Sequence, residues 1–217
     1  FVWGPPLLVL LVGTGFYLSV RLRLLQVFRL PKAIKLIFAS DSDGQGDISS
    51  FAALATALAA TVGTGNVVGV ATAIKLGGPG ALFWMWMAAF FGMATKYAEG
   101  VLAIKYRTKD ADGFIAGGPM YYIVNGMGQQ WKPLAIAFSI FGVMVALFGS
   151  GTFTQVNSIT DSLKNTVGWS PQVISIILAI LVSIIIFGGI KSISKVAESV
   201  VPFMAIIYII ATVTILL

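Results

Sequence analysis

The 217-residue sequence contains no cysteine and no histidine. Without cysteine it can form neither a disulfide nor a thiolate metal site. Without histidine it lacks the side chain that most often carries protons near neutral pH. Charged residues are also scarce, at 10% of the chain, against roughly 25% in soluble domains. These absences leave few groups for nucleophilic or metal-dependent catalysis, so no enzyme activity is expected.

Apolar residues are abundant instead, at 58% of the chain. Six apolar segments reach or approach the ~20 residues that a membrane-spanning helix needs, which predicts an all-α membrane protein. The chain begins without methionine and stops inside an apolar run, so it is expected to be a fragment of a longer protein. The six segments cover residues 1–20, 49–74, 80–104, 133–159, 171–190 and 197–217.

Polar and glycine-containing stretches separate these segments. Residues 41–47 read DSDGQGD, which predicts a linker, and the GGPG run at residues 77–80 predicts a tight turn. A short helix is expected near residues 119–125. Ser170 is expected to cap the helix that follows it, with Pro171 at the first helical position.

The basic residues give the helices a direction. If the first segment ends on one side of the membrane, all but Lys75 and Lys164 of the 14 basic residues fall on that same side. Cytoplasmic loops carry an excess of Lys and Arg, so this side is predicted to be cytoplasmic. The same asymmetry accounts for the net charge of +6 without a nucleic-acid partner. Residues 21–38 are basic and amphipathic, which favours a position along the inner leaflet; a merely solvated charged segment is the alternative.

Helix parity predicts how the chain is organised. Residues 1–48 would form one accessory spanning helix and the basic amphipathic segment, and residues 49–217 would form five helices that start inside and end outside. Because five is odd, a second copy of this unit would have the inverted orientation. The predicted architecture is therefore one extra N-terminal helix plus the first of two inverted five-helix repeats.

The second apolar segment contains a polar interruption, ATVGTGNVVG at residues 60–69. Unpaired backbone groups are costly in hydrocarbon, so glycines, threonines and an asparagine at this depth indicate a helix that opens to hold a ligand. Helices broken in this way mark the substrate and ion sites of secondary transporters. The alternative is plain helix packing through the small pair Gly65 and Gly69, which needs neither the Asn66 amide nor the hydroxyls beside it.

An opening near residues 62–66 would expose two different helix ends. The outer half, beginning at Gly65 or Asn66, would present free N–H groups and a positive dipole end to a carboxylate. The inner half would present carbonyl oxygens that, with the hydroxyls of Thr61 and Thr64, suit a hard cation such as Na⁺. No acidic residue falls near the middle of the six segments, which favours Na⁺ over a proton as the coupling ion.

A second polar cluster lies at residues 149–157, GSGTFTQVN. Gly151 and Gln155 are four residues apart and share a helix face, and the Gln155 amide can both donate and accept hydrogen bonds. Phe153 is expected to supply an apolar wall. The alternative is a hydrogen-bond cluster between helices. Outside these clusters, Glu99 is expected to pair with Lys96.

Four runs of the sequence resemble one known family. TVGTGNVVGVATAIKLGGPGALFWMW at residues 61–86, KYAEG at 96–100, AGGPMYY at 116–122 and GSGTFTQVNS at 149–158 are similar to the alanine or glycine:cation symporter family. The resemblance implies a LeuT-type fold of two inverted five-helix repeats after one extra helix. It also implies Na⁺-coupled uptake of alanine or glycine, by alternating access, across the cell membrane of a prokaryote.

A narrower resemblance concerns residues 62–66, VGTGN. This run looks like the VGLGN run in the broken first core helix of neurotransmitter:sodium symporters. It implies that backbone N–H groups and the asparagine side chain of the run bind the substrate carboxylate, and that carbonyls at the end of the inner half-helix bind Na⁺. Further ligands would come from the second repeat. Together with the second cluster, the expected ligands are Thr64, Gly65, Asn66, Gly151, Phe153 and Gln155 for the substrate, and Ala59, Thr61 and Val62 for part of a Na⁺ site.

Other functions stay open as alternatives. The main one is a proton-coupled amino-acid transporter of the same fold. A channel would use glycine-rich backbone as a selectivity filter, but such filters are built from repeated copies of a motif and only one copy occurs in this sequence. The expected partners are the amino acid, Na⁺ and membrane lipids, without nucleic acid. A monomer is compatible with the sequence, which does not define an oligomer.

Overall fold

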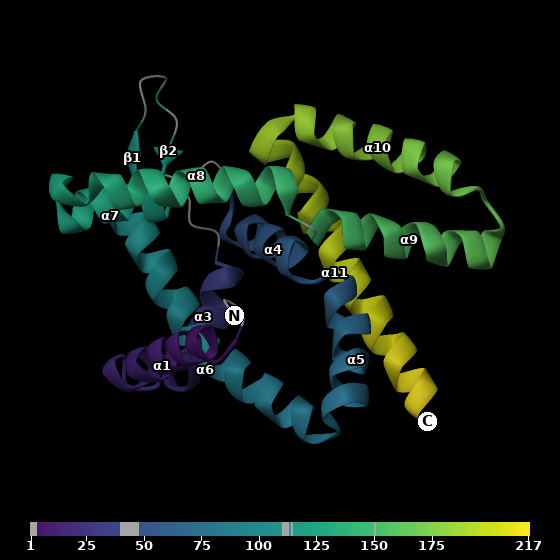
Figure 1. Cartoon of the computed structure of the whole chain (residues 1–217), viewed down its shortest axis with the longest axis horizontal. Coiled ribbons are helices and arrows are strands. Elements are labelled where there is room, and N and C mark those ends of the chain that lie inside the picture. Colours follow the sequence, from purple (N-terminus) through teal and green to yellow (C-terminus); the bar gives the residue numbers. More distant parts are fainter. Residues whose placement is uncertain (1–3, 40–47, 110–112, 114, 150) are drawn as a thin grey trace. The chain divides into compact units, whose positions relative to one another are not determined.

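The computed structural model describes residues 4–39, 48–109, 113, 115–149 and 151–217. Within these residues the chain is almost entirely helical, with one small antiparallel hairpin (Figure 1). This agrees with the predicted all-α class. The expected linker at residues 41–47 lies outside the described residues. The elements are α1 (Pro5–Arg21), α2 (Leu25–Phe28), α3 (Leu30–Ile37), α4 (Ser50–Thr61), η1 (Thr64–Asn66), α5 (Val68–Gly77), α6 (Gly80–Lys105), β1 (Thr108–Lys109), β2 (Ile115–Ala116), α7 (Pro119–Met127), η2 (Gln129–Trp131), α8 (Lys132–Phe148), α9 (Gly151–Val167), α10 (Pro171–Phe187) and α11 (Gly189–Leu216).

The chain divides into two compact units. The first consists of residues 1–33 and 73–149, and the second of residues 34–72 and 150–217. The second unit contains the polar interruption of the second apolar segment, together with residues 151–157 of the second polar cluster. The candidate ligands of both clusters therefore lie within one unit.

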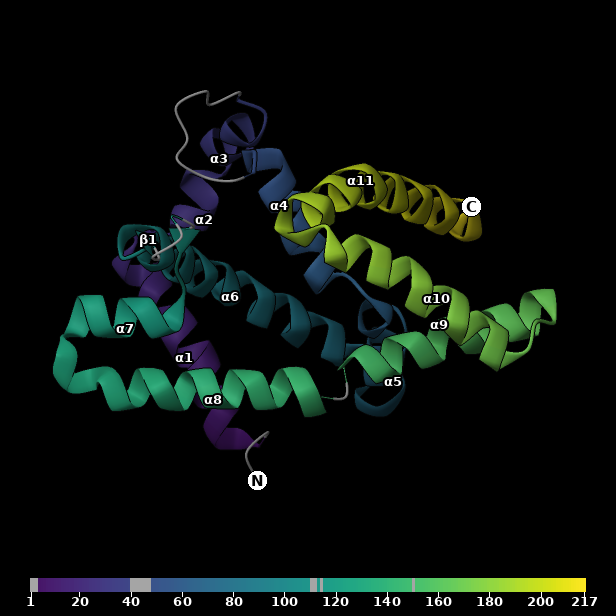
Figure 2. The same ribbon diagram turned by 90° about the horizontal axis from the view of Figure 1, so that it is seen from above.

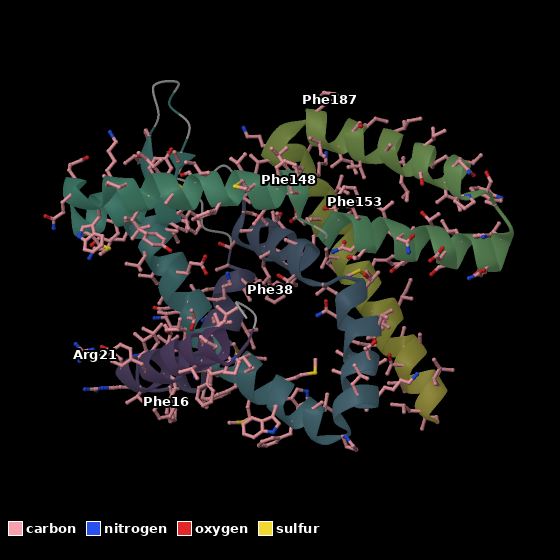
Figure 3. The ribbon with its side chains drawn as sticks, in the orientation of Figure 1. Phe16, Arg21, Phe38, Phe148, Phe153 and Phe187 are labelled. Atoms are coloured by element: carbon pink, nitrogen blue, oxygen red, sulfur yellow. The ribbon has the colours of Figure 1, made fainter. Side chains whose placement is uncertain are left out.

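In the first unit, α1 packs along α6. A Cβ atom at Gly15 would lie 2.6 Å from the carbonyl oxygen of Phe91, so only glycine fits at this approach of the two backbones. Ser19 is 1% exposed, and its hydroxyl donates a hydrogen bond to the Gly15 carbonyl at 2.8 Å. The ring of Phe16 (Figure 3) meets the edge of Phe91 with centroids 5.7 Å apart. Small residues thus let α1 and α6 pack closely, as is common between membrane helices.

The chain reverses sharply after α1. Arg23 and Leu24 have positive φ angles of 55° and 52°, a left-handed conformation that non-glycine residues rarely adopt. The Gln26 side-chain amide donates a hydrogen bond to the Ser19 hydroxyl at 2.8 Å, which links α2 to α1, and α2 also contacts α6. The basic segment therefore folds into two short helices, α2 and α3. Its position along an inner leaflet stays a prediction.

The C-terminal end of α6 and the short helix α7 form another contact region of the first unit. Between them, β1 and β2 pair with Thr108 opposite Ala116. The Asn125 side-chain amide donates a hydrogen bond to the Tyr106 carbonyl at 3.0 Å. The short helix begins at Pro119, so the prediction of a helix near residues 119–125 is confirmed.

Lys96 and Glu99 form the predicted ion pair, with 2.7 Å between Nζ and Oε2. Their side chains are 80% and 40% exposed, and exposed pairs contribute only about 0–1 kcal/mol to stability. Tyr122 on α7 responds to both charges. Burial raises the pKa of Tyr122 above its ordinary value, and the negative charge of Glu99 raises it further while Lys96 lowers it.

In the second unit, α4 packs against α11. Ala55, Ala197 and Val201 form a buried apolar cluster between these helices. The alanine-rich face of α4 therefore has a structural partner. Helix α10 contacts both α9 and α11, and in Figure 2 it crosses α9.

Two helix boundaries differ from those predicted. The single span expected over residues 133–159 is interrupted: α8 ends at Phe148, Gly149 is extended (φ −67°, ψ 135°), and α9 begins at Gly151. The glycines explain the interruption because each is less favourable in a helix than alanine by about 1 kcal/mol. The last helix begins at Gly189 instead of residue 197, because residues 190–197 contain neither glycine nor proline.

Other boundaries follow the sequence. Helix α10 begins at Pro171 with Ser170 at the N-cap, although the Ser170 side chain makes no capping hydrogen bond. The turn before α6 has Gly78 at a positive φ of 73°, as the GGPG run predicts. By length and composition, two helical stretches of the described chain can cross a membrane, Gln129–Val167 and Gly189–Leu216, and the bent pair of α4 with η1 and α5 would be a third.

Candidate functional site

The polar interruption is a true break in the helix. Helix α4 ends at Thr61, Val62 is extended (φ −85°, ψ 116°), and η1 forms one turn of 3₁₀-helix before α5 begins at Val68. The two halves are bent by 69°. The opening lies within residues 60–69, but regular α-helix resumes later than the expected Gly65 or Asn66. The 3₁₀ turn accounts for the difference, since such turns commonly begin helices.

Asn66 holds the break through the backbone of Gly63. Its side-chain Oδ1 accepts the Gly63 N–H at 2.9 Å, and its own N–H donates to the Gly63 carbonyl at 3.0 Å. Asn66 is the N3 residue of the second half-helix, and its side chain reaches back to the backbone N–H of the N-cap residue, Gly63, as the N3 residue of a capping box does. The sequence pattern did not indicate this local bond, and the expected contact of Asn66 with a ligand stays a prediction.

The two open ends of the break carry unpaired backbone groups. Among the described residues, the N–H groups of Thr64 and Gly65 donate no hydrogen bond. Likewise, the carbonyl oxygens of Ala59 and Val62 accept no backbone hydrogen bond in the described chain. The Thr61 hydroxyl donates to the Ala57 carbonyl at 2.7 Å and keeps oxygen lone pairs for a further partner. The geometry thus offers donors for an anion and oxygens for a cation at one opening.

Gln155 lies directly against the break. Helix α9 contacts η1 within the second unit, and a Cβ atom at Gly63 would be 3.0 Å from Nε2 and 3.3 Å from Cδ of Gln155. The structure therefore brings together two clusters that are far apart in the sequence. Gly151, one turn before Gln155 on α9, has open space where a side chain would be. Neither the local pattern nor the spacing of the sequence indicates which glycine Gln155 would touch.

Phe153 does not lie at the break. It is 70% exposed (Figure 3) and, with residues of α9 and α10 such as Val156 and Pro171, lines an open groove of about 880 Å³. No residue of the break lines this groove. On a helix, residues two apart face different directions, which separates Phe153 from Gln155. The apolar wall expected from Phe153 is therefore displaced from the other candidate residues.

The packing alternative for the glycine pair finds no support in these contacts. Among the atoms of the described residues, none would lie within 4 Å of a Cβ atom added at Gly65 or Gly69. Helix packing on this segment uses the alanines of α4 instead, of which Ala52 and Ala55 are buried. The glycines at the break thus leave space beside the unpaired N–H groups.

The chemistry of the break suits a monovalent cation more than a tightly bound divalent metal. Among the described residues, no group of three or more His, Cys, Asp or Glu side chains comes together. The oxygens available at the break belong to neutral carbonyl and hydroxyl groups. Such uncharged oxygens hold a cation less tightly than carboxylates do.

Broken apolar helices occur at the substrate and ion sites of secondary transporters. The chain belongs to the sodium:alanine symporter family, which it matches over residues 1–217. The family resemblance drawn from the four sequence runs is thereby confirmed.

Several curated proteins are similar to this chain along its length. An uncharacterized transporter of Haemophilus influenzae is 57% identical over 217 residues, which cover 100% of this chain and 47% of the relative. The sodium/alanine symporter AgcS of Methanococcus maripaludis is 54% identical, with 100% of this chain and 48% of AgcS covered. The probable sodium/glutamine symporter GlnT of Bacillus subtilis is 40% identical, with 96% and 43% covered. The chain thus spans just under half the length of the curated relatives it matches.

Proposed function

We propose that the protein containing this chain is a Na⁺-coupled symporter that takes up alanine or glycine across the cell membrane of a prokaryote. The observation that carries the proposal is the break between α4 and α5, where unpaired carbonyls end one half-helix and unpaired N–H groups begin the other. One opening of this kind can bind a carboxylate and a cation together. Two relatives bear the names of symporters for neutral amino acids, which supports the substrate class.

The proposal includes an architecture. Residues 1–48 supply the accessory helix α1 and the basic segment, and residues 49–217 supply the first repeat of a LeuT-type fold. In this repeat, α4 and α5 count as one broken helix. A second, inverted repeat in the full-length protein would supply the remaining ligands, and alternating access would move one group of helices against the other around the break.

The substrate is held by its charged groups. Its carboxylate binds the N–H groups of Thr64 and Gly65 at the start of the second half-helix, where the helix dipole is positive. Gln155 lies close enough to the break to accept a hydrogen bond from the substrate ammonium group. The open space at Gly65 and Gly151 accommodates a small side chain such as the methyl group of alanine.

Na⁺ binds at the other end of the break. The carbonyl oxygens of Ala59 and Val62, with the hydroxyl of Thr61, form part of its coordination shell. An ion at this end stabilises the opened form of the helix that also binds the carboxylate. Coupling between Na⁺ and the amino acid is then a free-energy linkage between two ligands of one conformation.

Proton coupling and channel activity are the competing functions. The helices of the break, residues 50–77, contain no Asp or Glu, so a proton would have no carboxylate to titrate beside the substrate. Na⁺ is therefore the better candidate for the coupling ion. The glycine-rich motif occurs once, whereas a selectivity filter needs several copies around a pore.

Uptake of radiolabelled alanine into proteoliposomes of the full-length protein tests the proposal. We expect accumulation with an inward Na⁺ gradient, none with K⁺ in place of Na⁺, and exchange of labelled for unlabelled alanine when both sides hold substrate. Accumulation driven by a pH gradient without Na⁺ would favour proton coupling. Flux that neither saturates nor shows exchange would favour a channel.

A further inference from the structure

Gly63 lies between two side chains that reach it from different elements. Asn66 of η1 accepts its N–H at 2.9 Å, and the Gln155 amide of α9 occupies the space where its side chain would be. We infer that Gly63 is a positioning residue: its missing side chain seats the Gln155 amide beside the N–H groups of Thr64 and Gly65. This inference rests on the proposed function, because it assigns Gly63 a part in binding the amino acid.

The backbone conformation does not explain a glycine at this place. Gly63 has φ −153° and ψ −168°, which is extended backbone that any residue adopts. A substituted side chain would therefore meet no backbone strain. Its obstacle is Gln155, with Nε2 and Cδ at 3.0 Å and 3.3 Å from the Cβ position. The contact with Gln155 is therefore the reason that a side chain at residue 63 would be unfavourable.

The contact fixes a distance within the site. The N–H groups for the carboxylate follow Gly63 directly in the chain, and Gln155 supplies the neighbouring amide. With glycine at residue 63, the amide can lie against the backbone of the break. With alanine, the amide must move away from that backbone by a few tenths of an ångström, because its Nε2 and Cδ atoms would be too close to the new Cβ atom. The separation between the carboxylate donors and the amide then increases, which weakens the hydrogen bond from a small amino acid that contacts both.

The test is a double-mutant cycle on the full-length protein, with KM and kcat measured for alanine under one ion condition. We expect Gly63→Ala to raise KM, by at most about the tenfold that complete loss of one hydrogen bond to a charged group would cause, with kcat nearly unchanged. In a Gln155→Ala background, Gly63→Ala should have no further effect, because the amide it displaces is gone. Gly69→Ala is the matched control, since its side chain would meet no atom within 4 Å.

Two results would overturn the inference: wild-type kinetics in Gly63→Ala, or the same loss in both backgrounds. A second variant covers a failure of Gly63→Ala to fold. Gln155→Asn draws the amide away from Gly63 without changing the broken helix, and it should also raise KM while keeping kcat. An unchanged KM in Gln155→Asn would contradict the inference independently. Alanine uptake by the wild type that needs no Na⁺ would instead contradict the proposed coupling. The double-mutant cycle could still be interpreted in that case, because it measures alanine kinetics alone.

Discussion

Replacing Asn66 by alanine removes the acceptor that holds the break together. The Oδ1 atom lies 2.9 Å from the Gly63 nitrogen, and a hydrogen bond of this kind contributes about 1 kcal/mol net. If the broken form of the helix is the conformation that binds both ligands, loss of this hydrogen bond lowers the population of that conformation. About 1 kcal/mol corresponds to roughly a fivefold change in an equilibrium constant. We therefore expect the half-saturating concentrations of alanine and of Na⁺ to rise together by about fivefold.

Asn66→Asp separates this structural role from direct binding. The aspartate keeps an oxygen that can accept the Gly63 N–H, but it adds a negative charge beside the proposed carboxylate. Alanine affinity should fall while Na⁺ affinity is retained. The assay is initial-rate uptake into proteoliposomes over a matrix of alanine and Na⁺ concentrations. If Asn66→Ala weakens alanine alone and leaves Na⁺ untouched, the asparagine acts as a ligand and the capping argument is refuted.

Three further predictions follow from the contacts. Gly15→Val should lower the thermal unfolding temperature clearly more than Gly13→Val, because a side chain at Gly15 would meet the α6 backbone whereas Gly13 faces open space; equal shifts would contradict this packing. Glu99→Gln should lower the pKa of Tyr122, because the Glu99 charge raises it, and ultraviolet titration against a variant with Tyr122 replaced by Phe measures the shift. Phe153→Ala should change the KM for alanine by less than about twofold, and a change of tenfold would return Phe153 to the substrate site.

Local chemistry made the break predictable. Three glycines, two threonines and Asn66 within residues 60–69 weaken a helix by propensity alone, so its opening follows from nearby residues. The ion pair of Lys96 with Glu99, the turn at Gly78 and the helix start at Pro171 are local in the same sense. Each depends on residues within one or two turns of each other.

Contacts between distant segments could not be predicted from the sequence. Four α-helices, α5 to α8, lie between Gly63 and Gln155 in the chain. No spacing rule indicates that these two residues would lie against each other. The hydrogen bond of Asn66 to the Gly63 backbone was not predicted, because an asparagine side chain can bond either a ligand or its own backbone; the expected contact of Asn66 with the substrate stays a prediction. The interruption at Gly149 was not predicted, because the apolar residues around it indicated a single span over residues 133–159. The glycines on both sides of residue 150 were the local signal for it.

The most direct test of the proposed function measures whether alanine binding and Na⁺ binding depend on each other. In the purified full-length protein, the Kd for alanine would be measured by calorimetry at increasing Na⁺ concentration, and the Kd for Na⁺ at increasing alanine concentration. If one broken helix holds both ligands, each ligand lowers the Kd of the other by the same factor, and Asn66→Ala shifts both Kd values. An alanine Kd that is independent of Na⁺ would contradict the claim that one broken helix holds both.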